Sequence, residues 1–389
     1  MNILHITPYV PSKKTSHAGG VCMGKESEWL RSNHEYHLLT FVNDRTEEGL
    51  LKEFDHGTVN VVRSNVITKA ICALIHPTLP PLFAIRASIS FSLKLIGLMK
   101  KYNIDAIHAE YTSMGQYAWI KRLFPNTVFN LVEHDVTYQS FERKLEKTSG
   151  AQRIITKRAL NQVARKESRW CRQADSVIAL SDKDKRLLEN TYKLAAPVYV
   201  LNPYYGIEGE DTKTPKRSRP TICFIGQMSR SENNEAALRL INIYLKNDLA
   251  SLCDLRIIGA NPSEEIIRLC NDHISASGFV EDINKDISSC SIAVFPLLAG
   301  AGIKLKVLLA ASLSLPVITT QIGAEGIDSD GKAISLANTD EEFAEEIRRL
   351  LLDSKYRQEI IRAQSELIQD KFSWEKSAAL LSTLYPPTE

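Results

Sequence analysis

The chain has 389 residues, which is more than one hydrophobic core commonly serves, so two domains are expected. Charged residues make up 24% of the sequence and the formal net charge is +2, so the charge balance gives no indication of nucleic-acid binding. The seven cysteines include no C-x-x-C pair, which argues against a structural zinc site and a disulfide framework. Met1 leads straight into a strand pattern, so we expect no signal peptide and a cytoplasmic protein.

In chain order, short apolar runs alternate with amphipathic stretches, a pattern typical of a parallel sheet flanked by helices. The strands expected in the first half are Ile3–Thr7, Tyr36–Val42, Thr58–Arg63, Ala106–Ala109, Thr127–Val132, Ser176–Leu180 and Val198–Leu201. The helices expected between them include Gly24–Arg31, Ile85–Lys101 and Thr156–Cys171.

Asn202–Pro220 interrupts this alternation with three prolines, two glycines and mixed charges, which is linker composition. The strands expected after it are Thr221–Ile225, Leu255–Ile258, Ser275–Phe279, Ile292–Phe295 and Pro316–Thr319. A last helix is expected to begin in Phe372–Glu375 and to run to about Tyr385, with Ser373 as its N-cap.

The pattern therefore predicts an α/β protein with two doubly wound, Rossmann-like domains. These are residues 1–203 and 221–371, joined by a linker at 204–220 and followed by a helical segment at 372–389. In doubly wound sheets ligands bind beyond the carboxyl ends of the strands, so two halves that face one another would form a binding cleft.

The most informative stretch is Phe295–Ile327, which predicts a strand, a glycine-rich turn, a helix, a second strand and another glycine-rich turn. Gly300 and Gly302 would let the backbone approach a ligand where a Cβ would intrude. A helix that begins directly after them directs unpaired N–H groups at the turn, and Lys304 and Lys306 add positive charges there. The turn suits a phosphorylated ligand, and an ordinary turn with two surface lysines is the alternative.

Two places in the first half are further candidates for a site. Gly19 and Gly20 precede the helix expected around Lys25–Arg31, where close approach to a ligand is again possible and a flexible loop is the alternative. His134 and Asp135 follow an expected strand at its ligand-binding end. An imidazole can donate to or accept from a ligand hydroxyl near neutral pH, although such a pair is often an ordinary loop.

A family resemblance is carried by the second half of the chain. Pro296, the Gly-x-Gly turn, Lys304-x-Lys306-Val307-Leu308, Pro316-Val317-Ile318-Thr319-Thr320 and Gly323-Ala324-Glu325-Gly326 resemble the donor-sugar-nucleotide region of GT-B glycosyltransferases. The chain is most similar to the retaining, family-four type of bacterial polysaccharide biosynthesis. The resemblance extends from Asn2-Ile3-Leu4-His5-Ile6 to Phe372-Ser373-Trp374-Glu375.

The resemblance implies two Rossmann-like domains that face one another across a cleft, and a last helix that crosses back to the first domain. It also implies transfer of a sugar from a nucleoside diphosphate sugar to a glycan or lipid-linked glycan acceptor, with retention and with no cofactor or metal. The catalytic candidates are His134 and Asp135, with Glu133 alongside. The donor-binding candidates that it implies are Gly19, Gly20, Gly226, Arg230, Gly302, Lys304, Lys306, Gly323, Ala324 and Glu325.

Two positions depart from the family pattern. Gln227 stands where members often carry an arginine, and Leu309 stands where a glutamate usually holds the ribose hydroxyls. A divergent transferase in which Lys304 and Lys306 neutralise the diphosphate is the preferred interpretation. The alternatives are a non-catalytic glycan-binding partner of a transferase and, less favoured, a sugar-nucleotide 2-epimerase.

Two stretches bear on the acceptor. Val66–Phe83 is apolar and contains three prolines, so it is too broken for a membrane span. A buried loop is favoured there, and an exposed apolar lip for a lipid-linked acceptor is the alternative. Arg143–Arg172 is rich in Lys and Arg, which indicates a solvated helix or a helix that binds anionic lipid headgroups. Peripheral contact with the inner face of the plasma membrane is therefore a hypothesis.

Overall fold

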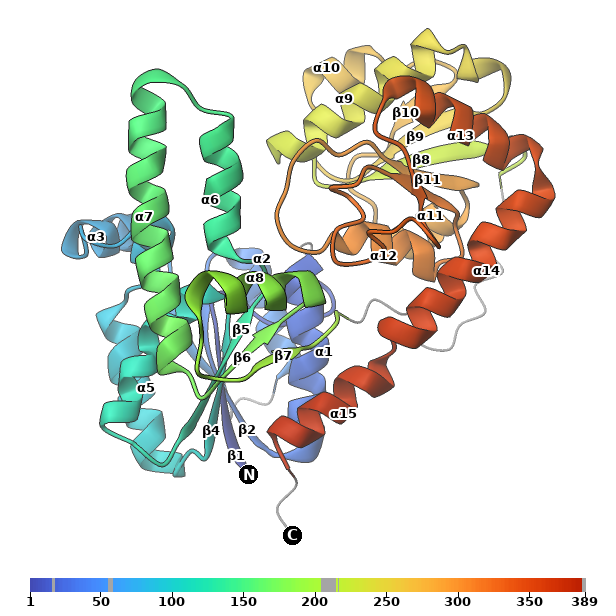
Figure 1. Cartoon of the computed structure of the whole chain (residues 1–389). Helices are drawn as coiled ribbons and strands as arrows, with labels where there is room; N and C mark the ends of the chain where they lie inside the picture. The colour runs from blue at the N-terminus through green and yellow to red at the C-terminus, as the bar shows by residue number, and fades with distance from the viewer. Residues whose placement is uncertain (16–17, 55–58, 204–214, 216, 387–389) are drawn as a thin grey trace. The chain divides into compact units, whose positions relative to one another are not determined.

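The computed structural model describes the chain apart from residues 16–17, 55–58, 204–214, 216 and 387–389. The chain forms two compact units (Figure 1). Unit 1 contains Met1–Tyr204 together with Glu375–Glu389, and unit 2 contains Tyr205–Trp374. Most of the expected linker, 204–220, lies outside the described residues. Each unit is considered by itself.

Unit 1 is built on a parallel seven-stranded sheet with the strand order β3-β2-β1-β4-β5-β6-β7. Its strands are β1 (Asn2–Thr7), β2 (Glu35–Val42), β3 (Val59–Arg63), β4 (Ala106–Glu110), β5 (Val128–Glu133), β6 (Ser176–Ala179) and β7 (Val198–Val200). Its helices are α1 (Ala18–Asn33), α2 (Arg45–Leu50), η1 (Leu51–Glu53), α3 (Val66–Ile75), α4 (Pro81–Ala84), α5 (Ile89–Tyr102), η2 (Thr112–Arg122), α6 (Thr137–Glu146), α7 (Gly150–Gln173), α8 (Asp182–Tyr192) and, from the end of the chain, α15 (Trp374–Leu384).

Unit 2 is built on a parallel six-stranded sheet with the order β10-β9-β8-β11-β12-β13. Its strands are β8 (Thr221–Ile225), β9 (Asp254–Ile258), β10 (Ile274–Ala276), β11 (Ile292–Phe295), β12 (Val317–Thr319) and β13 (Ser335–Leu336). Its helices are α9 (Ser231–Lys246), η3 (Leu249–Ser251), α10 (Glu264–Arg268), α11 (Ile283–Ser288), α12 (Leu305–Ser312), α13 (Asp340–Leu352) and α14 (Ser354–Lys371). The predicted fold class, two doubly wound α/β domains, is thus confirmed.

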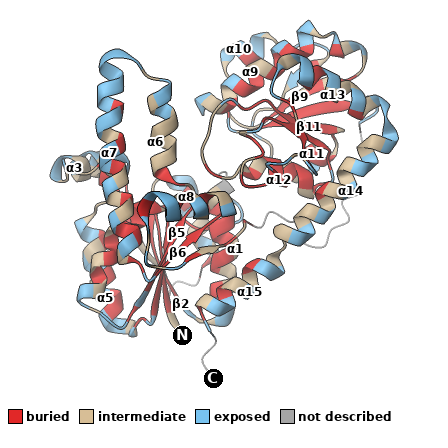
Figure 2. Cartoon of the chain, in the orientation of Figure 1, coloured by how far each residue is buried: buried red, intermediate tan, exposed pale blue. Residues whose placement is uncertain are grey.

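The strands are buried in both units, and each helix that covers a sheet buries the side that faces the strands (Figure 2). This burial explains why the strands read as continuous apolar runs rather than as alternating ones. In unit 1, Phe91 of α5 stacks on Phe41 of β2 at a centroid distance of 4.7 Å. Phe83 of α4 meets Trp170 of α7 edge-on at 4.8 Å. Such aromatic pairs add to the free energy gained from apolar burial.

The last helix completes the core of unit 1. Tyr385, the residue after α15, is fully buried there, and its Oη lies 2.6 Å from His108 Nδ1. Ser377 of α15 donates a 3.0 Å hydrogen bond to the carbonyl of Asn202. Unit 1 is therefore made from two segments that are far apart in the sequence.

All twelve predicted strands overlap observed ones, with differences at their ends. Thr58 lies outside the described residues. The strand predicted at Ser275–Phe279 ends at Ala276, because Gly278 adopts a φ of 65° that no strand allows. The two-residue strand β13 was not predicted, since Ser335 and Leu336 are too few to form a pattern.

The helix starts differ more. The helix predicted at Gly24–Arg31 already begins at Ala18, so Gly19 and Gly20 lie in its first turn and not in a loop before it. The helix predicted at Ile85–Lys101 begins only at Ile89, because Ser88 is its N-cap and accepts a hydrogen bond from the N–H of Phe91.

The preferred interpretation of Val66–Phe83 as a buried loop is wrong for residues 66–75, whereas Phe83 at its end is buried. Asn65 and Thr68 form a capping box that starts helix α3, and no residue of this helix is buried. Val66 and Leu74 are about four-fifths exposed, at 83% and 79%. Among the described residues, no helix combines the length and apolar character needed to cross a membrane.

Candidate functional site

In unit 1, the order of the strands reverses between β1 and β4, which is where doubly wound sheets bind ligands. His5 of β1 pairs in register with His108 of β4, so the two imidazoles lie next to one another within the sheet. Glu110 is the last residue of β4, and His134 follows the end of the neighbouring strand β5. The topology thus gathers titratable side chains at one edge of the sheet.

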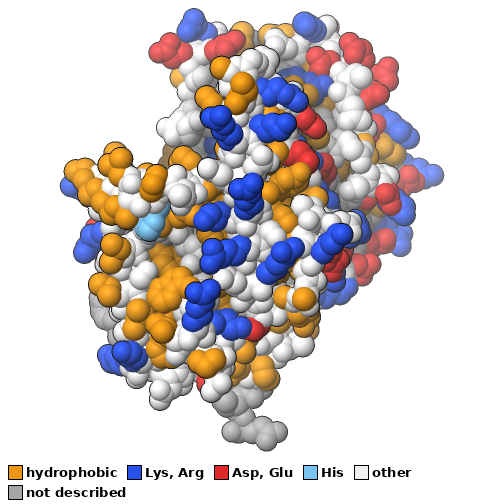
Figure 3. All heavy atoms as spheres, turned by 60° about the vertical axis from the view of Figure 1, so that its left-hand side comes forward, with side chains coloured by type: hydrophobic (Ala, Val, Ile, Leu, Met, Phe, Trp, Pro, Cys, Tyr) orange, Lys and Arg blue, Asp and Glu red, His pale blue; other side chains and the backbone are white. Residues whose placement is uncertain are grey.

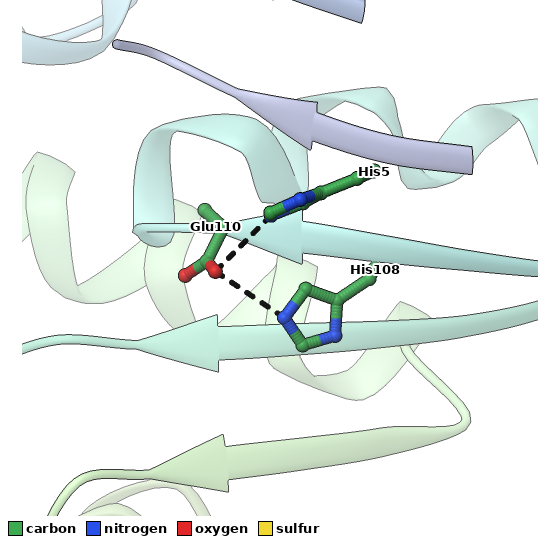
Figure 4. Close-up of side chains that lie close together, drawn as sticks. All are labelled: His5, His108 and Glu110. Atoms are coloured by element: carbon green, nitrogen blue, oxygen red, sulfur yellow. Dashed lines mark hydrogen bonds and ion pairs between the residues drawn. The ribbon is translucent and has the colours of Figure 1, made fainter. Parts of the chain in front are cut away.

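Glu110 lies at the centre of this group. Its Oε1 accepts hydrogen bonds from His5 Nε2 and His108 Nε2, both at 3.2 Å. Figure 4 shows both imidazoles converging on this carboxylate from their two strands. Its Oε2 accepts a 2.6 Å hydrogen bond from His134 Nε2. All three partners are buried, and both His5 and His108 are fully so.

The charges of the cluster follow from its burial and its contacts. Burial lowers the pKa of His5 to about 4, so this imidazole is neutral near pH 7. Burial acts in the same direction on His108, but Tyr385, Glu110 and Glu26 outweigh it and raise its pKa well above the usual value. Burial acts to raise the pKa of Glu110, but the histidine hydrogen bonds hold it well below the usual range. The cluster thus contains an anionic Glu110 and a cationic His108.

The ligand atoms of His5, His108 and Glu110 lie within 4.8 Å of one another, and in the described part of the chain this is the one group placed to hold a metal ion. Each of these atoms already has a hydrogen-bond partner inside the cluster. The donors and acceptors are therefore satisfied without an ion. The expectation that no metal is needed stays a prediction.

His134 is held between two further residues. The ring of Tyr111 stacks on it, with centroids 3.8 Å apart and planes 3° from parallel. A Cβ added to Gly19, in the first turn of α1, would lie 3.4 Å from His134 Nδ1 and 2.0 Å from Tyr111 Oη. The close approach inferred for Gly19 is thus an approach to these two side chains.

Sequence reasoning missed Glu110 and Tyr111. Tyr111 adopts a φ of 68° and a ψ of 148°, a backbone conformation that residues other than glycine rarely adopt. Such strain is typical of functional positions. The sequence does offer one signal for them. Glu110 and Tyr111 lie at the carboxyl end of a predicted strand, as His134 does at the end of the next one.

A second pair of buried acids lies beside this group. Glu167 of α7 accepts hydrogen bonds from the N–H groups of Thr137 and Tyr138, at 2.7 and 3.0 Å, and so caps α6. Burial raises the pKa of Glu167 to about 7. Burial and the nearby charge of Glu167 raise the pKa of Glu133 well above its usual value. Asp135 is half-buried and accepts a long, 3.5 Å hydrogen bond from the Ser140 hydroxyl.

In unit 2 the strand order reverses between β8 and β11. Five of the predicted donor-binding residues follow these two strands, namely Gly226, Arg230, Gly302, Lys304 and Lys306. Gly323, Ala324 and Glu325 follow β12. Gly226 follows β8, and a Cβ there would lie 3.0 Å from the Asn233 side chain and 3.1 Å from Lys306 Nζ. Lys306 of α12 donates a 2.5 Å hydrogen bond to Asn233 Oδ1 and lies 5.0 Å above the ring of Phe224. The structure thus brings Gly226 and Lys306 together, with Asn233 as a partner that the sequence did not reveal.

Lys306 lies in an unusual electrostatic setting. Burial lowers its pKa to about 7, opposed by the charge of Glu232 and reinforced by the charges of Arg230 and Lys304. A lysine with this pKa gains a full charge when an anion approaches it. Arg230, the exposed N-cap of α9, is therefore near enough to Lys306 for their charges to interact.

The glycine-rich turn before α12 has a backbone conformation that favours glycine. Gly300 and Gly302 have φ values of 127° and 65°, which side chains disfavour. The Lys304 ammonium donates to the carbonyls of Gly302 and Ala301, at 2.6 and 3.2 Å, so it folds back on its own turn. Lys304 and Lys306 thus make different contacts, although the sequence predicts the same role for both.

The turn at 323–326 has two backbone N–H groups that are already hydrogen-bonded to Thr320. The N–H of Gly323 donates to Thr320 Oγ1 at 3.1 Å, and that of Ala324 donates to the Thr320 carbonyl at 3.0 Å. Gly323 is required because a Cβ would lie 1.9 Å from Thr319 Oγ1. Glu325 is half-buried in the same turn.

The two departures from the family pattern have different surroundings. Gln227 is exposed, whereas Leu309 is buried within α12 with 4% of its surface accessible. A leucine offers no oxygen to a ribose hydroxyl. Losing one charge-assisted hydrogen bond of that kind costs about 1.5–3 kcal/mol of binding free energy.

Two family models match the chain. The model described as Glycosyltransferase Family 4 matches residues 27–203, and the model described as Glycosyl transferases group 1 matches residues 219–353. A search of curated proteins gives no match.

Solved structures share the fold over nearly the whole chain. Sucrose-phosphate synthase from Thermosynechococcus elongatus is 16% identical with a TM-score of 0.71, covering 99% of this chain and 98% of that one. HepE from Anabaena, in complex with UDP, is 15% identical with a TM-score of 0.70, covering 99% of both chains. TarM is 11% identical with a TM-score of 0.67, covering 99% of both chains. At these identities the likeness concerns the fold.

The two family models fall one on each unit and together span most of the chain. The strand orders of both sheets and the full-length structural likeness agree with them. This protein therefore belongs to the GT-B glycosyltransferases, with a family-four domain followed by a group-1 domain.

Proposed function

We propose that this glycosyltransferase moves a hexose-type sugar from a nucleoside diphosphate sugar to a glycan or lipid-linked glycan, with retention, in surface polysaccharide biosynthesis. The observation that carries the donor assignment is the contact of Lys306 with Asn233 beside Gly226, at the ligand-binding end of the unit 2 sheet. HepE has been solved with UDP and with UDP-glucose, which favours a uridine nucleotide as the first donor to test.

Lys306 is the group best suited to the leaving diphosphate. Its burial lowers its pKa to about 7, so a large share of the amine is uncharged near neutral pH. An approaching diphosphate favours the charged form again. The glycine-rich turn at 300–302 leads into the first turn of α12, whose backbone N–H groups suit phosphate oxygens. Neutralising the charge that develops on a departing group commonly contributes more to such catalysis than any other single effect.

His134 is the group that we propose for the transferred sugar. Its Nε2 is occupied by Glu110, so Nδ1 is the ring atom left to accept a hydrogen bond from a sugar hydroxyl. Gly226, Arg230, Gly302 and Lys304 are proposed to surround the donor phosphates with Lys306. Gly20 and Asp135 stay candidates, as do Gly323, Ala324 and Glu325.

A thermal-shift screen of the purified chain with UDP, GDP, CMP and their common sugar conjugates tests the donor assignment. Binding to the native state must raise the melting temperature, by an amount that grows with ligand concentration. A rise with one nucleotide series, followed by transfer to an acceptor and by NMR of the anomeric configuration in the product, supports the proposal. No response to any nucleotide would favour the glycan-binding partner, since such a protein needs no donor.

We also propose that unit 1 contacts an anionic membrane surface, where a lipid-linked acceptor would lie. The contact surface, here called the apolar-basic face, is formed by α3 and the first half of α7. Ile67 and Ile71 of α3 are 69% and 48% exposed, and Ile154 and Ile155 of α7 are 58% and 65% exposed. Apolar side chains and cations side by side match the acyl and headgroup regions of an anionic bilayer.

The charge of this face is one-sided. Residues 143–172 contain ten Lys and Arg and two Glu, and one of these acids, Glu167, is buried. Figure 3 shows apolar side chains beside a column of Lys and Arg side chains, with few acidic ones among them, on the side of unit 1 where Figure 1 places α3 and α7. Each basic residue near an anionic surface contributes about 1 kcal/mol of binding free energy at low salt.

Flotation with vesicles of phosphatidylglycerol and phosphatidylcholine tests this contact. Wild type should float with anionic vesicles at low salt and less at high salt. Replacing Ile67 and Leu74 with Asn should abolish flotation, whereas the control Ile267→Asn on α10, whose side chain is 55% exposed in unit 2, should not. Wild type that stays unbound at low salt would remove membrane contact from the proposal.

A further inference from the structure

We propose that Glu110 is the positioning residue for His134, and that it connects this histidine through His108 to Tyr385 beyond the last helix. The inference rests on the proposed function, because it assigns a task to a group that touches the transferred sugar. It concerns three residues that the sequence did not single out and that no ligand needs to contact.

The two oxygens of Glu110 serve different partners. Oε1 binds the two buried imidazoles of the sheet, whereas the hydrogen bond of Oε2 in the described structure goes to His134 at 2.6 Å. An ionised carboxylate can only accept hydrogen bonds, so His134 must present a proton on Nε2. In the neutral imidazole this leaves the Nδ1 lone pair for a ligand, as a carboxylate does for catalytic histidines elsewhere.

The ring of His134 is also fixed in orientation. Tyr111 covers one face at 3.8 Å, and the backbone of Gly19 lies at the Nδ1 edge. With Nε2 tied to Glu110, rotation of the ring would break a short hydrogen bond to a buried charge. Holding such a group in place strongly affects the reaction rate, because a displacement of about 1 Å can lower that rate roughly 100-fold.

Glu110 is itself held from the other side. His108 donates through Nε2 to Glu110 and Glu26, at 3.2 and 3.0 Å, and its Nδ1 lies 2.6 Å from Tyr385 Oη. His5 donates to the same Glu110 oxygen and contacts Tyr36 Oη at 2.9 Å through its other nitrogen. Every donor and acceptor along this path is buried, so a change at one end has no water to replace the lost bond.

A purely structural role for this cluster is the competing explanation, and a double-mutant cycle separates the two. Glu110→Gln should lower kcat on the order of 100-fold. It should leave the UDP-induced rise in melting temperature unchanged, because the proposed nucleotide contacts belong to unit 2. In the His134→Ala background, Glu110→Gln should have no further effect on kcat, since the group it positions is absent.

Two further variants keep the test independent of folding. Tyr385→Phe removes only the hydroxyl next to His108 and should lower kcat several-fold, again only when His134 is present. Tyr36→Phe is the matched control, because it removes a buried hydroxyl that contacts His5 and Ser27, and neither of these lies on the path from His134 through Glu110 and His108 to Tyr385. It should lower the melting temperature and leave kcat unchanged.

The outcomes distinguish this inference from the function on which it rests. If wild type transfers sugar and Glu110→Gln lowers kcat equally with and without His134, Glu110 does not act through His134 and the inference fails. If Tyr36→Phe lowers kcat as strongly as Glu110→Gln, the cluster is only structural and the inference also fails. If wild type binds no nucleotide, the proposed function itself has failed.

Discussion

Gly19 and Tyr111 approach so closely that a Cβ on Gly19 would lie 2.0 Å from Tyr111 Oη, well inside the contact distance of two heavy atoms. Gly19 is in the first turn of α1, and Tyr111 forms the stack on His134. The glycine therefore determines how near α1 can come to the histidine, whatever ligand it also faces.

The variant Gly19→Ala should thus be less stable and less active than wild type, by about 1–3 kcal/mol of unfolding free energy. The helix propensity of Ala would act in the opposite direction, by about 1 kcal/mol, so a loss can be attributed to the contact. Adding Tyr111→Phe removes the hydroxyl and should restore the melting temperature. The control is Gly97→Ala in α5, where a Cβ meets nothing within 4 Å and the stability should rise or stay unchanged. A stable Gly19→Ala would contradict the packing described here.

Lys306 and Lys304 should differ strongly in their contribution to catalysis. Lys306→Ala should lower kcat/KM by roughly 100-fold or more, the cost of losing one donor to a developing anion. Lys304→Ala should have a smaller effect, because that ammonium already binds the carbonyls of Gly302 and Ala301. Steady-state kinetics with the donor found by thermal shift measures both. Near-normal turnover of Lys306→Ala would remove Lys306 from the mechanism.

The affinity for nucleoside diphosphate should fall as the pH rises above 7. The pKa of Lys306 is about 7 in the protein, so above this pH the free site has lost its charge, and binding must take up a proton. Linkage of one proton weakens binding by up to about tenfold per pH unit. Calorimetric titration at pH 7 and pH 9 measures the slope. Lys306→Arg stays charged over this range and should flatten it, so an equal slope in both proteins would exclude Lys306 as its source.

The buried acids Glu133 and Glu167 should make unit 1 less stable at alkaline pH. Burial raises both pKa values in the folded protein, that of Glu167 to about 7. In the unfolded chain the pKa of a glutamate is about 4.3. At pH values between the unfolded and the folded pKa, the folded chain binds more protons than the unfolded chain. The stabilisation is therefore complete at acidic pH and is lost as the pH rises. Glu133→Gln should therefore stabilise the protein at pH 8, by about 1–3 kcal/mol, and not at pH 4.5.

Chemical denaturation of wild type and Glu133→Gln at both pH values measures this difference. A variant that is destabilised equally at pH 4.5 and pH 8 would show that Glu133 acts as a hydrogen-bond partner of Thr112 and not as a titrating acid.

The parallel sheets could be predicted from the sequence because their strands are buried on both faces and read as apolar runs, as in Thr221–Ile225. Helix α3 could not be assigned to the surface in the same way. Its composition is that of a core helix, yet in the structure none of its residues is buried and Val66 and Leu74 are strongly exposed. An apolar pattern predicts a helix or strand, but burial depends on what packs against it.

The candidate site was predictable where glycine marks a special backbone, as at Gly302 with its positive φ. It was not predictable where the chemistry depends on a partner from another strand or helix. Glu110 and Asn233 carry no motif, and each becomes important through one contact, with His134 and Lys306. Such pairs are separated by 24 and 73 residues in the sequence.

The burial of Tyr385 in unit 1 has a consequence for biosynthesis. The first 204 residues leave the ribosome without the segment that completes their core, and that segment follows only after the whole of unit 2. At translation rates of about 5–20 residues per second, this delay lasts on the order of 10–40 s. During this delay the side chain of Tyr385 is missing from the core of unit 1. Unit 1 is therefore synthesised first, but its core is completed only after unit 2 has been made.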